Sequence, residues 1–211
     1  MQMIIAIFFG GVDLKGKKVY SVIKRVIDVI LSVILLFFLA VPMLIIWISI
    51  AITSKGGAIF SQKRIGKNGR SFVCYKFRTM RMGTPLCSAK QMAENGGADK
   101  YLTPLGKILR STSLDELPQL WNVLKGDMSL VGPRPLIEDE TEVHRARESS
   151  GVYRIRPGIT GLAQVKGRNR LSDEKKVALD EQYLNNFGFV QDVRILGLTA
   201  LGVIFRRDIN V

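Results

Sequence analysis

The sequence predicts an α+β protein, mostly helical, that forms a small membrane-associated domain. Three observations predict this class. Residues 29–52 form a run of 24 residues without a charge, Asn68-Gly69 separates two strand-like segments, and Thr103 and Ser172 carry helix-capping signals. The chain has 211 residues, which is enough for one domain with a membrane segment and too few for two large domains.

The composition argues against several classes of protein. Hydrophobic residues make up 47% of the chain, which rules out a disordered or fibrous protein. Two cysteines, Cys74 and Cys87, are too few for a disulfide framework or a cysteine-rich zinc site. The one histidine, His144, gives Ser–His catalysis little to work with. Neither a Walker A pattern nor a GxGxxG fingerprint occurs, so ordinary nucleotide-binding folds are disfavoured.

The N-terminal region divides into an extension and a membrane segment. Residues 1–19 are expected to be an extension, because the first twelve are apolar but lack the charged start and the cleavage site of a signal peptide. Residues 20–54 are expected to form the membrane-inserted helix. Residues 55–211 then form the body, with a C-terminal helix on the membrane surface.

The topology of the apolar run is open on the residues alone. As a straight helix, residues 29–52 would reach about 36 Å, enough to cross a hydrocarbon core of about 30 Å. However, Pro42 lies inside the run and predicts a kink or a break. The flanks also carry five basic residues each, whereas a spanning helix normally has an excess on the cytoplasmic side. A re-entrant helix and a spanning helix are therefore both compatible with the sequence.

Local signals predict the elements of the body in order. Asn68-Gly69 predicts a β-hairpin between residues 59–65 and 71–77. Thr103-Pro104 predicts a helix that closes at Arg110, and Ser172 begins another. Residues 83–100 are small and polar and predict a loop. Residues 195–205 are uncharged but too short to span a bilayer, so they predict either an interfacial helix or a buried core helix.

The charge pattern predicts an anionic partner. The formal net charge is +13, and residues 55–81 carry eight positive charges and no negative one. Because this block adjoins the apolar run, lipid headgroups explain it most simply. Nucleic acid is not expected, since no recognised nucleic-acid-binding module is visible.

An adjacent pair of carboxylates, Asp115 and Glu116, is the sharpest polar feature. One interpretation is a capping box between Ser113 and Glu116 at the start of a helix. Pro118 argues against it, because proline would distort that helix beyond its first free N–H groups. The alternative begins the helix at Pro118 and leaves the pair in the turn before it, where two carboxylates could converge on a metal–phosphate complex.

Arginines at rigid turns predict contacts with phosphate. Arg134 lies between two prolines, and Arg156 and Arg168 flank a glycine-rich segment. Arginine offers two parallel donors to a phosphate, and glycine allows close backbone approach. Together with the acidic pair, these turns predict one diphosphate site.

Three segments together resemble the bacterial monotopic phosphoglycosyl transferases, which are the initiating sugar transferases of exopolysaccharide and glycoconjugate assembly. The segments read KFRTM at 76–80, RSTSLDELPQLWNVLKGDMSLVGPRP at 110–135 and RPGITGLAQVKGR at 156–168. The resemblance extends from about residue 20 to the C-terminus and is closest to the small, minimal form of the family.

The resemblance implies a small α/β body with a re-entrant helix and surface-lying helices, on the cytoplasmic face of the bacterial inner membrane. It implies transfer of a sugar 1-phosphate from a UDP-sugar to polyprenol (undecaprenyl) phosphate with release of UMP, and a requirement for Mg²⁺. The expected partners are the UDP-sugar, the polyprenol phosphate and membrane lipids, and a homo-oligomer is left open.

The resemblance also assigns roles to individual residues. Asp115 matches the nucleophile that forms an aspartyl–phosphosugar intermediate, and Glu116 matches its partner near the metal, so both are expected Mg²⁺ ligands. The expected substrate-binding residues are Lys76, Arg78, Arg110, Arg134, Arg156, Gln164, Arg168 and Asp180.

One position departs from the family pattern. The family often has serine before the membrane proline, whereas this chain has Val41-Pro42, and valine cannot satisfy carbonyls that are freed at a break. An alternative function is a non-enzymatic, basic membrane-anchored adaptor for an acidic partner or an anionic lipid. That alternative leaves Asp115, Glu116 and the arginine turns without a shared purpose.

Overall fold

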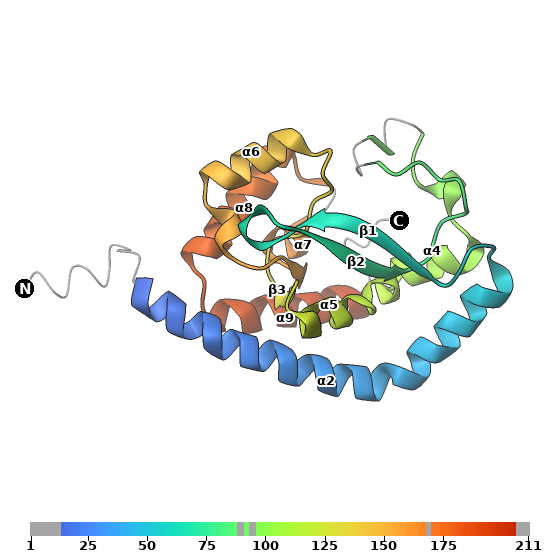
Figure 1. The fold of residues 1–211 in the computed structure, drawn as a ribbon, viewed down its shortest axis with the longest axis horizontal. Coiled ribbons are helices and arrows are strands. Elements are labelled where there is room, and N and C mark those ends of the chain that lie inside the picture. The colour runs from blue at the N-terminus through green and yellow to red at the C-terminus, as the bar shows by residue number, and fades with distance from the viewer. Residues whose placement is uncertain (1–13, 88–90, 93–95, 168–169, 206–211) are drawn as a thin grey trace, which may run out of the picture.

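A computed structural model shows a mostly helical α+β body that rests on one long helix (Figure 1), as the sequence predicts. It describes residues 14–87, 91–92, 96–167 and 170–205, so most of the predicted extension lies outside the described residues. The principal helices are α2 (Leu14–Thr53), α4 (Pro104–Ser111), α5 (Gln119–Lys125), α6 (Thr141–Ser149), α7 (Leu162–Val165), α8 (Asp173–Asn185) and α9 (Phe189–Ile204). The strands are β1 (Ile59–Ile65), β2 (Ser71–Phe77), β3 (Ser129–Val131) and β4 (Gly158–Thr160).

Helix α2 is longer than predicted and begins inside the expected extension. It has 40 residues and continues through Pro42, and Figure 1 shows it bending around the body toward its C-terminal end. Within the described residues it is the one helix long and apolar enough to cross a membrane by length and composition. Only 6% of its most apolar window is buried, so it is not the core helix of the body.

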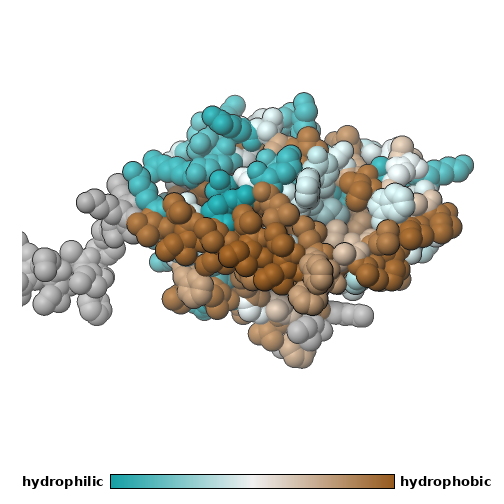
Figure 2. Space-filling view, turned by 60° about the horizontal axis from the view of Figure 1, so that its bottom comes forward, coloured by the Kyte–Doolittle hydropathy of each residue, from teal (hydrophilic) through white to brown (hydrophobic). Residues whose placement is uncertain are grey.

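The amphipathicity of α2 is inverted with respect to a helix on a soluble protein. On the side facing the body, Lys24 and Asp28 are buried, and Ser32 follows one turn later with 0% exposure. On the outward side, Val22 and Val26 are exposed. Because soluble helices bury their apolar face and expose their polar face, the outward surface of α2 matches lipid. Figure 2 shows the resulting apolar band across this face of the molecule.

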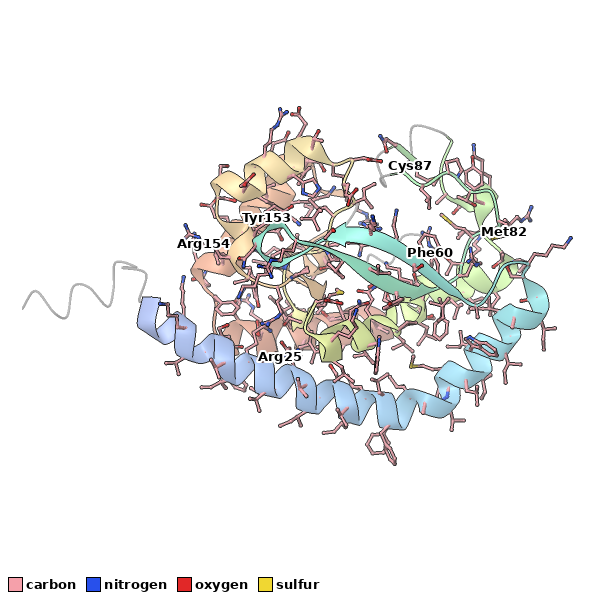
Figure 3. The ribbon with its side chains drawn as sticks, viewed as in Figure 1. Arg25, Phe60, Met82, Cys87, Tyr153 and Arg154 are labelled. Carbon is pink, nitrogen blue, oxygen red and sulfur yellow. The ribbon has the colours of Figure 1, made fainter. Side chains whose placement is uncertain are left out.

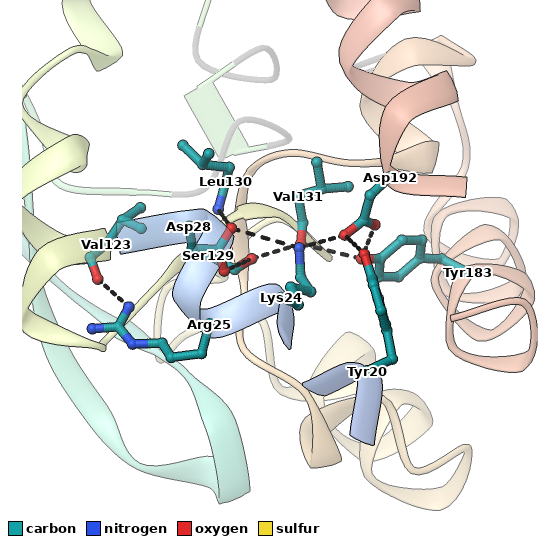
Figure 4. Close-up of polar contacts among 10 residues, drawn as sticks. All are labelled: Tyr20, Lys24, Arg25, Asp28, Val123, Ser129, Leu130, Val131, Tyr183 and Asp192. Carbon is teal, nitrogen blue, oxygen red and sulfur yellow. Dashed lines mark hydrogen bonds and ion pairs between the residues drawn. The ribbon is translucent and has the colours of Figure 1, made fainter. Parts of the chain in front are cut away.

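A buried polar network joins α2 to the body (Figure 4). Lys24 Nζ lies 2.6 Å from Asp192 Oδ2 on α9, and Tyr20 donates a hydrogen bond to the same oxygen. The Asp28 carboxylate accepts hydrogen bonds from Ser129 Oγ at 2.7 Å and from the Leu130 N–H at 3.1 Å. Three turns of α2 therefore fix the positions of both β3 and α9.

Basic residues of α2 also satisfy the C-terminal carbonyls of two shorter helices. Arg25 donates to Val123 O at 2.5 Å and to Leu124 O at 2.9 Å, at the end of α5. Lys17 donates to Leu184 O at 2.9 Å, at the end of α8. Cations are favourable at helix C-termini, where carbonyls lack intrahelical partners. The basic residues ahead of the apolar run thus attach α2 to the body, in addition to contributing positive charge.

The predicted hairpin is confirmed with its predicted strand bounds. Strands β1 and β2 pair antiparallel from Ile59 opposite Phe77 to Ile65 opposite Ser71. The turn has Asn68 at φ 58° and Gly69 at φ 70°, a left-handed conformation that asparagine and glycine adopt most readily.

The two predicted helix starts are confirmed. Thr103 Oγ1 accepts a hydrogen bond from the Gly106 N–H at 2.9 Å, and Ser172 caps α8 in the same way. Gly106 is required for packing, because a Cβ there would lie 2.0 Å from Thr79 O. Helix α4 ends at Ser111, one residue after the predicted end.

The second sheet was not predicted. Strands β3 and β4 pair in parallel, and both have only three residues. The core between these strands, the hairpin and helices α5, α7, α8 and α9 contains the buried residues Cys74, Leu120, Val123, Met128, Leu130, Val131, Leu162, Tyr183 and Ile195.

Helix α9 contains most of the predicted C-terminal apolar segment, and its two sides differ in exposure. Ile195 is fully buried in the core, and Thr199 bonds to Thr160 of β4 at 2.7 Å. In contrast, Val190 and Val193 are 81% and 50% exposed. One side of α9 therefore packs on the body, and the other presents apolar side chains outward.

The network predicts a large stability effect for Asp28. Asp28→Ala should lower the free energy of unfolding by about 2–4 kcal/mol, because it leaves the Leu130 N–H without its buried acceptor and removes one of the two carboxylates beside Lys24. Thermal unfolding of the detergent-purified chain measures this change. Val26→Ala is the control on the outward side of the same helix and should have little effect, and equal losses in the two variants would contradict the assignment.

Candidate active site

The acidic pair lies in a one-turn 3-10 segment, Leu114–Glu116, between α4 and α5. Ser113 adopts φ 57°, a left-handed conformation that redirects the chain after α4. Its side chain forms no hydrogen bond that caps the described 3-10 segment. The capping-box interpretation is therefore wrong. The placement of the pair in a turn is confirmed, since Asp115 and Glu116 precede α5, whose N-cap is Pro118 and whose first residue is Gln119, one residue after the predicted start.

Glu116 lies between two cations that come from distant parts of the chain. Lys76 Nζ of β2 donates to Glu116 Oε1 at 2.7 Å, and a guanidinium nitrogen of Arg134 donates to the same oxygen at 3.2 Å. The Lys76 and Glu116 side chains are 19% and 15% exposed, whereas that of Arg134 is 43% exposed. The three side chains thus form a partly open ion-pair cluster that Arg134 borders on the solvent side.

Asp115 is the buried member of the pair, with 7% exposure. Burial raises the pKa of its carboxyl above the ordinary value, the positive charge of Lys76 opposes that rise, and the negative charge of Glu116 adds to it. Arg110 and Arg134 also lower this pKa, by smaller amounts. The structure therefore brings together four sequence-predicted residues around Asp115: Lys76, Arg110, Glu116 and Arg134.

Asn122 fixes the hairpin against α5, a role that the sequence analysis missed. Its side chain is fully buried, accepts from the Tyr75 N–H at 3.0 Å and donates to Val73 O at 2.6 Å. The side-chain amide thus occupies the hydrogen-bonding edge of β2 as a neighbouring strand would. As a result, Lys76 at the end of β2 is held beside the turn that precedes α5.

Two further guanidinium groups hold the backbone carbonyls of Arg134 and Pro135. Arg147 of α6 donates to Arg134 O at 2.7 Å and pairs with Asp180 at 2.6 Å, and both side chains are buried. Arg64 of β1 donates to Pro135 O at 3.2 Å. Asp180 therefore acts on the site through Arg147. Sequence analysis missed Arg147, because nothing in the α6 sequence marks it as buried.

Cations are crowded at this corner of the molecule. Burial, and then the charge of Arg134, lower the pKa of Arg64 to about 10. A guanidinium whose pKa is reduced by a neighbouring cation would be stabilised by a nearby anion. The crowding of Arg64 and Arg134 therefore favours a phosphate group next to Glu116.

The remaining predicted residues lie elsewhere. Arg78 donates to Gly57 O and lies over the Phe60 ring, at the start of the hairpin. Gln164 is buried in α7, where its amide donates to Ile159 O and its Oε1 has no hydrogen-bond partner among the described residues. Arg156 donates to Gly126 O, beyond the opposite end of α5. Arg168 lies outside the described residues.

The donor chemistry of the acidic pair suits a hard cation that also binds phosphate. No group of three or more metal-ligating side chains occurs among the described residues. Mg²⁺ commonly uses one or two carboxylates and takes its other ligands from water and substrate phosphates. Asp115 and Glu116 supply that number, although Glu116 Oε1 is already bonded to Lys76 and Arg134.

A sequence model of the bacterial sugar transferase family matches residues 19–206, which includes all of the described elements except the first five residues of α2. The chain belongs to the bacterial sugar transferase family. The resemblance deduced from the three motifs is thereby confirmed.

This sugar transferase has relatives of two sizes. It is 38% identical over 197 residues to the exopolysaccharide production protein ExoY of Sinorhizobium fredii, covering 87% of this chain and 86% of ExoY. It is 39% identical over 207 residues to an undecaprenyl-phosphate galactose phosphotransferase of Salmonella typhimurium, covering 92% of this chain but 42% of that protein. The chain therefore spans about two fifths of the Salmonella relative and most of ExoY.

The environment of Asp115 predicts a gain in stability when its charge is removed. The raised pKa means that folding disfavours the ionised carboxylate, so this cost is complete above the folded pKa and disappears as the pH falls toward the ordinary value of about 3.9. Asp115→Asn should therefore raise the unfolding temperature at pH 7.5 by a few degrees, and the difference should shrink in acid. Asp139→Asn, at an exposed carboxylate, is the control and should change little. A less stable Asp115→Asn protein at pH 7.5 would contradict this account.

Proposed function

We propose that this transferase moves a sugar 1-phosphate from a UDP-sugar to undecaprenyl phosphate and releases UMP. The observation that supports it most is the buried Asp115 beside a Glu116 that is paired with Lys76 and Arg134. The printed name of the Salmonella relative, an undecaprenyl-phosphate galactose phosphotransferase, supports the acceptor. The product would be a polyprenol diphosphate sugar, the first membrane intermediate of exopolysaccharide or glycoconjugate assembly.

The proposed reaction has two displacement steps at one phosphorus atom. In the first, an Asp115 carboxylate oxygen attacks the phosphorus that carries the sugar, the bond from that phosphorus to the bridging oxygen breaks, and UMP leaves with that oxygen. In the second, a phosphate oxygen of the polyprenol phosphate attacks the same phosphorus and the Asp115 carboxylate is released. Covalent catalysis divides the transfer so that the nucleotide departs before the lipid phosphate reacts.

The surrounding cations address the electrostatic difficulty of this chemistry. A carboxylate that attacks a diphosphate brings negative charge toward negative charge, and positioned cations lower that barrier. Lys76 and Arg134 border the pair directly, and Arg110 lies close enough to lower the pKa of Asp115. When Mg²⁺ is bound, Asp115 and Glu116 would hold it, and it would supply further positive charge to the phosphate oxygens.

The apolar surface supports a location at the depth of the lipid headgroups. Besides the outward side of α2, Ile108 of α4 and Trp121 of α5 are 59% and 55% exposed, close in sequence to the acidic pair. Val190 and Val193 of α9 are further exposed apolar side chains. We propose that these side chains contact the cytoplasmic face of the inner membrane, and that the bend of α2 makes it re-entrant. The phosphate of a polyprenol lipid would then reach Asp115 without leaving the interface.

The role of Asp115 can be tested with one variant and a matched control. Asp115→Asn should reduce UMP release from UDP-sugars by on the order of 10³-fold or more, because an amide cannot form the acyl phosphate. Asp139→Asn should retain activity. Purified protein, Mg²⁺, undecaprenyl phosphate and a panel of UDP-sugars form the assay. Without acceptor, peptide mass spectrometry should find the phosphosugar on residue 115, and an adduct on another residue would overturn the mechanism. Absence of UMP release from every donor would favour the adaptor.

The guanidinium group of Arg134 gives a second expectation. Arg134→Lys should raise the KM for the UDP-sugar by about tenfold although the charge is kept, because lysine cannot make two parallel contacts with a phosphate. Arg145→Lys, on the exposed side of α6, is the matched control and should leave KM unchanged. Equal KM values for wild type and Arg134→Lys would exclude Arg134 as a phosphate contact.

A further inference from the structure

A second cluster of cations surrounds a small pocket between α2 and the body. The pocket is lined by Lys24, Arg25, Lys67, Arg154 and Arg156, with Asp28 as its one acidic residue. We infer that this basic pocket binds the phosphate of an anionic membrane phospholipid, at a site separate from the acidic pair.

The basic pocket and the acidic pair lie at opposite ends of α5. Glu116 precedes the first turn of the helix, whereas Arg25 bonds to its last carbonyls and Arg156 bonds to Gly126 O just beyond it. Seven helical residues extend about 10 Å. A phosphate in the basic pocket is therefore too far from Asp115 to be the phosphate that reacts there.

The charges of the basic pocket are not balanced by carboxylates. Lys24 and Asp28 belong to the buried network described above. Among the described residues, the other four cations form no salt bridge with a carboxylate, and Arg25 and Arg156 use part of their donors on backbone carbonyls of the α5 end. Burial, and then the charge of Arg156, lower the pKa of Arg25. Three guanidinium groups and one ammonium group around one opening favour an anion between them.

The position of the pocket on α2 favours a lipid as the source of that anion. Arg25 lies one turn before the apolar run, and its neighbours Val22 and Val26 face outward, where we place lipid. Figure 3 shows Arg25 on α2 and Arg154 on the body, and both line this pocket. A phospholipid lying along α2 could insert its phosphate and leave its glycerol and acyl chains outside.

Binding of soluble short-chain lipids to the detergent-purified chain tests the inference. Dihexanoyl phosphatidylglycerol should raise the unfolding temperature in a saturable way, whereas dihexanoyl phosphatidylcholine should do so much less. The double variant Lys67→Glu with Arg154→Glu should weaken the apparent affinity for phosphatidylglycerol at least tenfold. The control Arg145→Glu with Lys175→Glu changes the net charge equally on exposed residues of α6 and α8, and it should bind within twofold of wild type.

Further binding measurements distinguish a phospholipid from a free anion and from the acceptor lipid. Asp115→Asn should bind phosphatidylglycerol like wild type, so failure of the proposed transfer reaction would leave this result unchanged. Arg154→Ala alone should show a smaller loss in the same direction, which covers the case of a double variant that does not fold. Inorganic phosphate that binds as tightly as the lipid would assign the pocket to a free anion, and tighter binding of farnesyl phosphate would assign it to the acceptor. Either result, or equal losses in the control, would overturn the inference.

Discussion

The buried contact between Lys24 and Asp192 determines how the membrane helix and the body are related. An apolar helix can rotate against an apolar surface at little cost, but a buried charge requires its partner in one geometry. Asp28 adds two hydrogen bonds to β3, and Tyr183 donates to Asp192 from α8 at 2.6 Å. Because these polar contacts define the inward side of α2, they also define which apolar side chains face outward. The orientation of the body relative to the apolar outward side of α2 follows from this network.

Helix α5 connects the long helix α2 with the turn that carries the acidic pair. It is only seven residues long, which is too short for stability on its own. Arg25 satisfies its C-terminal carbonyls, and Asn122 joins it to the edge of β2. These contacts fix the middle and the C-terminal end of the helix, so the turn that carries Asp115 and Glu116 is positioned by a helix that also contacts α2.

The acidic pair combines two different electrostatic environments. Glu116 is compensated by Lys76 and Arg134, whereas Asp115 is more deeply buried and has a raised pKa. A carboxylate that is poorly stabilised before the substrate arrives is consistent with the nucleophile proposed for it, since its charge is lost when the covalent bond forms. The backbone around Arg134 is held by Arg64 and Arg147, which keeps this cation in place despite its exposure.

The sequence by itself determined the local elements and pointed to Asp115 and Glu116 as the candidate reactive residues. Turn and cap chemistry depends on neighbouring residues, so Asn68-Gly69, Thr103 and Pro118 were sufficient to place the hairpin, α4 and the acidic turn. The apolar run was equally clear, because its length exceeds that of an ordinary core helix. Only the tertiary structure decided that Arg156 lies at the opposite end of α5 from Asp115, and that Asn122 and Arg147 position the site. Those placements depend on contacts between segments 30 or more residues apart, such as Tyr75 with Asn122 and Arg147 with Asp180, and such contacts leave no periodic or local pattern in the sequence.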